Sequence, residues 1–260
     1  MKRVSLLILV VGGLILLAMP ANALDLINED FSPPADVILN ANSGIKTTSD
    51  YNQWIDFPSA VPGSNRWDIG SADTNHFAQH VVQGSDSTNV LMYGIDATSL
   101  LPGTELTLSF NYLATRTAYA YVVGMDIDYH YLDNYGPWLD GETATSGGWN
   151  VQWLGTDGVV LEKYTLAAVS GDLADLSQWG AFTSSPLTWT GSGVGWNINT
   201  NSYETFDFDT LAIAFVMGGT TGNRAIDNVR LEASVPEPAT LFLLGSGLIG
   251  LAAFRRKFRK

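Results

Sequence analysis

Cysteine is absent from the 260 residues, and basic residues are few, with 13 Lys and Arg against 26 Asp and Glu. Without cysteine the chain has no disulfide, no thiolate nucleophile and no cysteine-ligated zinc. The shortage of cations argues against nucleic acid and anionic lipid as partners, because each phosphate contact needs a Lys or Arg. Neutral glycans and divalent cations are compatible with this charge.

The motifs of common enzymes are also missing. The sequence has no Gly-x-Ser-x-Gly elbow, His-Glu-x-x-His helix, P-loop or dinucleotide-binding fingerprint. Acid pairs such as Asp207 and Asp209 would suit glycoside hydrolysis, but that chemistry depends on a spacing in three dimensions, and acids are common here. We therefore predict a non-catalytic protein with no catalytic residues, and keep a glycan-acting hydrolase as the alternative.

The C-terminal end combines three features in a fixed order. Pro236, Glu237 and Pro238 predict an extended segment, because proline lacks a backbone donor and biases the residue before it away from helix. The apolar run 239–254 has 16 residues, which at about 1.5 Å per residue predicts a short transmembrane helix of roughly 24 Å. The positive-inside rule holds the five cations that follow on the cytoplasmic side. These cations are Arg255, Arg256, Lys257, Arg259 and Lys260.

The N-terminal end predicts a signal peptide. Two basic residues precede the apolar stretch 4–18, and Ala21-Asn22-Ala23 is a small-x-small cleavage site, so we expect a signal helix and a cut by signal peptidase after Ala23. The remaining segment 24–238 keeps six basic residues against all 26 acidic ones, a net charge of about −20. Its length is sufficient for one β domain with a sizeable core.

Between the two ends, short alternating runs rich in β-branched and aromatic residues are bounded by Gly, Pro, Asn and Asp. This pattern predicts an all-β fold, an antiparallel β-sandwich. A short helix is predicted within 166–178, centred on 172–176. The expected strands are Leu106–Leu113, Ala118–Leu132, Asn89–Gly94, Val159–Thr165, Phe206–Met217 and Ala225–Glu232.

The C-terminal order of Pro-Glu-Pro, apolar span and basic end resembles the PEP-CTERM sorting signal of Gram-negative bacteria. The resemblance implies that an exosortase recognises and removes this tail, so that the chain is anchored in the inner membrane before it reaches the cell surface or the extracellular matrix. The expected division is a signal peptide at 1–23, a β-sandwich domain at 24–233 and a sorting signal at 234–260.

A second resemblance concerns the domain. Residues 26–31, 106–112 and 225–231 look like the first, central and last strands of jelly-roll surface modules, which include carbohydrate-binding and choice-of-anchor domains. In such modules the first and last strands pair, and carboxylates near them hold a structural calcium ion. The resemblance implies that Glu29, Asp30 and Asp227 bind Ca²⁺, an ion that takes oxygen ligands. The alternative is that Asp227 makes a turn and that Glu29 is solvated.

A ligand site is expected near residues 118–138. In the strand predicted at 118–132, side chains alternate between the two faces, so that Asp126, Asp128 and His130 share one face. Tyr135 and Trp138 flank Gly136-Pro137 and are expected to be exposed. Flat aromatic faces beside carboxylates suit extracellular polysaccharide. The alternatives are a solvated sheet face and aromatic core packing, and a remote third function is ice binding.

Overall fold

The computed structural model describes residues 23–32, 38–40, 48–57, 65–72, 75–82, 89–116, 118–127, 158–197, 202–217 and 223–234. Contacts divide the chain into two units, one of residues 25–232 and one of residues 1–24 with 233–260. No helix within the described ranges is long and apolar enough to cross a membrane. The span predicted at 239–254 and the signal helix predicted at 1–23 lie outside those ranges.

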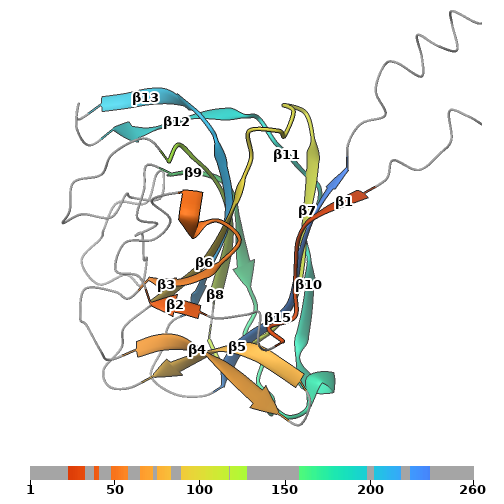
Figure 1. Ribbon diagram of the computed structural model, residues 1–260. Helices are drawn as coiled ribbons and strands as arrows, with labels where there is room; N and C mark the ends of the chain where they lie inside the picture. Colours follow the sequence, from red (N-terminus) through yellow and green to blue (C-terminus); the bar gives the residue numbers. More distant parts are fainter. Residues whose placement is uncertain are drawn as a thin grey trace, which may run out of the picture. The chain divides into compact units, whose positions relative to one another are not determined.

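The described residues form β-strands and two 3₁₀ turns, numbered in chain order, and Figure 1 labels strands where there is room. The strands are β1 (Ala23–Glu29), β2 (Ile38–Asn40), β3 (Trp54–Phe57), β4 (Asn65–Ala72), β5 (Asn75–Val82), β6 (Asn89–Asp96), β7 (Glu105–Ala114), β8 (Ala118–Met125), β9 (Gly158–Leu166), β10 (Gly180–Thr183), β11 (Leu187–Thr188), β12 (Ser192–Asn197), β13 (Ser202–Asp207), β14 (Thr210–Met217) and β15 (Arg224–Ser234). The 3₁₀ turns are η1 (Thr48–Asp50) and η2 (Leu176–Gln178).

Two sheets carry most of these strands. The first sheet has the order β10-β7-β15-β5-β4, with β1 also paired to β15 and β11 to β7. The second sheet has the order β2-β3-β6-β14-β8-β9, and β12 and β13 form a separate two-stranded sheet. Strand β2 runs parallel to β3, whereas β14 is antiparallel to both β6 and β8. The predicted all-β, mostly antiparallel fold is therefore confirmed.

Aromatic rings join the two sheets. Phe110 on β7 meets Phe215 on β14 edge to face, with ring centroids 4.9 Å apart. Trp54 on β3 lies 6.2 Å from Phe215 and 4.9 Å from Phe31, which follows β1. Such edge-to-face and tilted pairs add to the free energy that burial of the rings supplies. The face of the second sheet that carries Trp54 and Phe215 is therefore its inner face.

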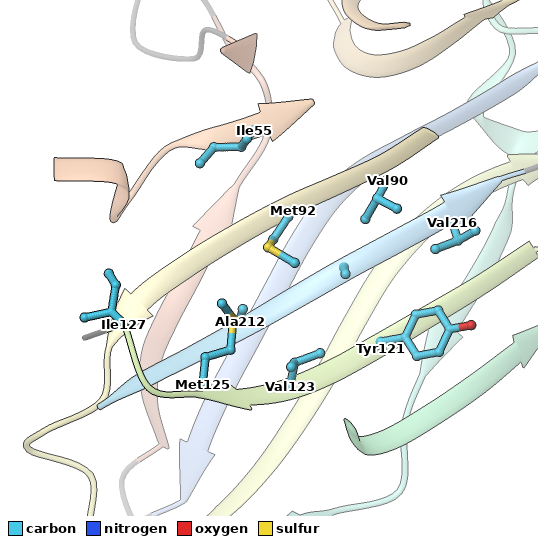
Figure 2. Close-up of a cluster of buried hydrophobic side chains, with 10 residues drawn as sticks. Ile55, Val90, Met92, Tyr121, Val123, Met125, Ile127, Ala212 and Val216 are labelled. Atoms are coloured by element: carbon cyan, nitrogen blue, oxygen red, sulfur yellow. The ribbon is translucent and has the colours of Figure 1, made fainter. Parts of the chain in front are cut away.

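The opposite face of the second sheet is buried as well. Because side chains alternate along a strand, the neighbours of Phe215 on β14 point away from the first sheet. They join an apolar cluster from four strands and Ile127, the second residue after β8, which we call the outer-face cluster (Figure 2). Its members are Ile55, Val90, Met92, Tyr121, Val123, Met125, Ile127, Ala212, Ala214 and Val216. Every residue of β14 is buried, as expected for a strand covered on both faces.

Most predicted strands are confirmed, with three differences. The run Phe206–Met217 is split between β13 and β14, because the chain turns at Phe208 and Asp209. Strand β8 ends at Met125, earlier than expected. The predicted helix within 166–178 is wrong, since only η2 forms there. Asp172 and Asp175 accept hydrogen bonds from the backbone of Ala174 and Ser177, and such local bonds compete with a helical ladder.

Candidate functional site

Asp227 on β15 is the most enclosed of the predicted calcium ligands, with no exposed surface. Its Oδ2 accepts hydrogen bonds from Asn75 Nδ2 at 3.0 Å and Asn228 Nδ2 at 3.1 Å, and its Oδ1 accepts one from the Asn228 backbone at 2.7 Å. Burial raises the pKa of Asp227 above its ordinary value, and the nearby Asp30 raises it further. The hydrogen bonds and His76 act in the opposite direction.

The backbone beside this carboxylate pair is unusual. Phe31 and Asn228 have φ values of 55° and 51°, in the left-handed region that residues other than glycine rarely adopt. Asparagine tolerates this conformation, whereas for phenylalanine it is sterically unfavourable. Phe31 is fully buried against Trp54, and we attribute the tolerated strain to that packing. Asp30 and Asp227 each immediately precede one of these two left-handed residues.

Glu29 forms a hydrogen bond with a residue of the second sheet. Its Oε1 accepts a hydrogen bond from the Tyr93 hydroxyl at 3.1 Å, and Tyr93 lies on β6 of the second sheet. The structure thus brings Asp30 and Asp227 together and directs Glu29 elsewhere. Within the described ranges, no group of three or more His, Cys, Asp or Glu side chains is arranged to hold a metal ion.

Of the predicted ligand-binding residues, only Asp126 lies in the described part of the chain, where it is half-buried just after β8. The following residue is fixed in place, because the Ile127 backbone donates to Asp209 Oδ1 at 3.0 Å. The Tyr51 hydroxyl lies 2.6 Å from Thr210 Oγ1 at this end of the outer face. Asp128, His130, Tyr135 and Trp138 lie outside the described residues.

A group that the sequence did not reveal lies at the far end of β8. Tyr119 and Tyr121 have ring centroids 6.2 Å apart on the outer face. Lys163 on β9 places its Nζ 4.6 Å from the Tyr119 ring centroid and 5.7 Å from that of Tyr121, within cation–π range. Tyr119 and Lys163 are half-buried, so part of each remains accessible. The β8–β9 register, which pairs Tyr121 with Lys163, creates this tyrosine–lysine group.

A buried histidine and arginine lie inside the domain. His80 on β5 is 3% exposed and Arg224 on β15 is 1% exposed, with Arg224 Nη1 3.4 Å from His80 Nδ1. The His80 ring also packs against Trp67, with centroids 5.3 Å apart. Burial, and then the positive charge of Arg224, lower the pKa of His80 to about 3. The imidazole is therefore neutral at physiological pH.

The residues of the predicted sorting signal lie outside the described residues. They are the motif Pro236, Glu237 and Pro238 and the cations Arg255, Arg256, Lys257, Arg259 and Lys260. Residues 234–257 match the family model of the PEP-CTERM protein-sorting motif. This motif marks a chain for export in Gram-negative bacteria through a membrane-anchored sorting signal and for processing by an exosortase. The predicted sorting signal is confirmed at this level.

Solved structures with a similar chain path include sugar-binding and adhesin domains. A candidate sugar-binding protein from Bacteroides thetaiotaomicron is 14% identical, with 80% of this chain and 99% of that one covered and a TM-score of 0.46. TmCBM61 in complex with β-1,4-galactotriose is 11% identical, covers 73% and 94%, and scores 0.36. The K1 adhesin domain of Lys-gingipain from Porphyromonas gingivalis is 14% identical, covers 83% and 99%, and scores 0.35. No curated protein matches this chain.

The neutral His80 predicts a specific pH dependence of stability. In the folded chain His80 stays neutral down to about pH 3, whereas in the unfolded chain it binds a proton below pH 6.5. The free energy of unfolding must therefore fall as the pH drops through 6.5 toward 3. Between pH 6.5 and pH 5 this amounts to about 2 kcal/mol. We expect urea unfolding of His80→Gln to lose that share of the pH slope, and an unchanged slope would contradict the assignment.

Proposed function

We propose that this chain is an exported, non-catalytic protein of the cell surface or extracellular matrix, in which a jelly-roll β-sandwich is delivered by an exosortase-processed tail. The observation that carries the proposal is the sorting motif at 234–257, which begins at the last residue of β15. Signal peptidase acts at the other end, after Ala23. The inner membrane is a temporary partner, and the domain itself is the part that functions after sorting.

Three described carboxylates with shifted pKa values do not suit glycoside hydrolysis. A glycosidase needs a general acid with a raised pKa that faces a second carboxyl group across a cleft. The pKa of Asp227 is raised, but this side chain has no exposed surface and its oxygens accept three hydrogen bonds. Exposed Asp96 and Asp175 have lowered pKa values because Thr98 and Ser177 donate hydrogen bonds to them. Neither kind of carboxyl group suits proton donation to a leaving sugar.

We assign binding of a neutral polysaccharide to the domain, with the tyrosine–lysine group as one contact. The accessible part of Tyr119 offers an apolar ring surface to the C–H face of a sugar, and Lys163 can donate hydrogen bonds to its hydroxyls. A net charge of about −20 on residues 24–238 repels acidic polymers and leaves neutral ones unaffected. The residues predicted from the sequence for the same ligand remain predictions; they are Asp126, Asp128, His130, Tyr135 and Trp138.

A structural calcium ion is a separate proposal for Asp30 and Asp227. Burial and the nearby Asp30 raise the pKa of the Asp227 carboxyl, so a cation bound between exposed Asp30 and buried Asp227 would stabilise the charged form of Asp227, and calcium prefers oxygen ligands. Asn75 and Asn228 already donate hydrogen bonds to Asp227. The proposed site offers the ion only the carboxylates of Asp30 and Asp227, so backbone carbonyls or waters would complete its coordination. Glu29 is not required in this arrangement.

The sorting proposal predicts the mass of the mature protein. When the chain is recovered from its native host, intact-mass analysis should detect a species without residues 1–23 and without the basic end 255–260. The physical reason is that the short apolar run holds the Pro-Glu-Pro segment at the membrane surface, where a processing enzyme can reach it. A mature protein that keeps Arg255 to Lys260 would make the tail a permanent anchor.

The glycan proposal predicts binding without turnover. The processed protein should bind one or more neutral saccharides on a glycan array, and Tyr119→Ala should weaken that binding by roughly tenfold through loss of ring stacking. Thr107→Ala, on the other sheet, is the matched control and should bind like the wild type. Shortened saccharide products would favour the hydrolase, and no response to any saccharide would leave a structural matrix role.

The calcium proposal predicts a metal-dependent melting temperature. Calcium at about 100 times its dissociation constant should raise the midpoint above that in chelator by about 5–10 °C for a domain of this size. Asp227→Asn should remove the difference, whereas Asp207→Asn, an exposed site on β13, should keep it. Equal midpoints with calcium and with chelator in the wild type would exclude the ion.

A further inference from the structure

The sorting signal follows the folded domain without a spacer. Strand β15 continues to Ser234, the family match begins at that same residue, and a single residue separates it from Pro236. Ala233 is fully buried. A protease binds its substrate as an extended chain on both sides of the cut, and whether a segment is accessible depends on its burial and its backbone pairing. The chain up to Ser234, two residues before Pro236, belongs to a paired strand.

Strand β1 is one of the partners of β15, beside β7 and β5. Strands β1 and β15 run in opposite directions, because Asp25 contacts Arg230 while Asp30 lies near Asp227. The start of β1 therefore lies beside the end of β15. Arg230 Nη2 is 2.8 Å from Asp25 Oδ1, Arg230 Nε donates to the same oxygen at 3.0 Å, and Arg230 Nη1 is 3.0 Å from Glu232 Oε1. We call Arg230, Asp25 and Glu232 the Arg230 clamp.

We propose that the exosortase takes the tail only after the end of β15 has separated from its neighbours in the first sheet, so that the Arg230 clamp, which ties β15 to β1, contributes to the rate of sorting. The inference rests on the proposed processing of the tail. When strand ends open and close quickly, cleavage follows the population of the opened form. The clamp is half-exposed, with 46% of the Arg230 side chain and 42% of the Asp25 side chain accessible. An ion pair of this kind changes the opening equilibrium by about two- to fivefold.

The test follows conversion of the full-length precursor to the processed chain in the native host after a pulse of labelled synthesis. Arg230→Ala should be processed about two- to fivefold faster than the wild type. Arg116→Ala is the matched control, because it removes one exposed cation from the turn after β7. Its rate should equal that of the wild type.

A second variant separates strand opening from a general loss of stability. A flexible Gly/Ser insertion between Ser234 and Val235 lets the enzyme reach the tail while β15 stays paired, so this chain should be processed faster than the wild type. Adding Arg230→Ala to the insertion should then have no further effect. Equal rates for wild type and Arg230→Ala, or the same acceleration in both backgrounds, would overturn the inference. Absence of any processing in the wild type would instead overturn the sorting proposal itself.

Discussion

Burial of the second sheet on both faces is the constraint on which the domain depends. Along β14, alternate side chains point inward to Phe110 and Trp54 or outward to the outer-face cluster, and all eight residues are buried. After Thr210, whose hydroxyl is hydrogen-bonded to Asp209, a polar side chain at any of the remaining positions would lose its hydration without a partner to replace it. The strand therefore reads as a continuous apolar run, and its neighbours β6 and β8 supply matching apolar faces.

Three of the few described cations each occupy a specific place. Arg224 is buried beside His80, Arg230 bridges two acids on the first sheet, and Lys163 lies over two tyrosines. None of the three belongs to a basic patch of the kind that binds phosphate. The net negative charge of residues 24–238 favours mutual repulsion between copies of the domain.

Strand positions were predictable from the sequence because alternation and β-branched content are local signals, and β7 was predicted within one residue at each end. The proximity of Asp30 to Asp227 was predicted from the resemblance. The hydrogen bond that Tyr93 donates to Glu29 was not, because it depends on how the two sheets face each other. The tyrosine–lysine group was missed because its members come together only through the β8–β9 register. The prediction of a helix within 166–178 was wrong because aspartate side chains accept hydrogen bonds from nearby backbone N–H groups.

The position of β15 determines when the domain can finish folding. This strand is the last in the chain, yet it lies inside the first sheet, between β7 on one side and β5 and β1 on the other. Strand β14, which comes just before it, is likewise internal to the second sheet. Contacts of such long sequence separation form late, because the intervening loops must close first. Neither sheet can close until the chain up to Ser234 has emerged, so the strands at the centre of both sheets are among the last to dock.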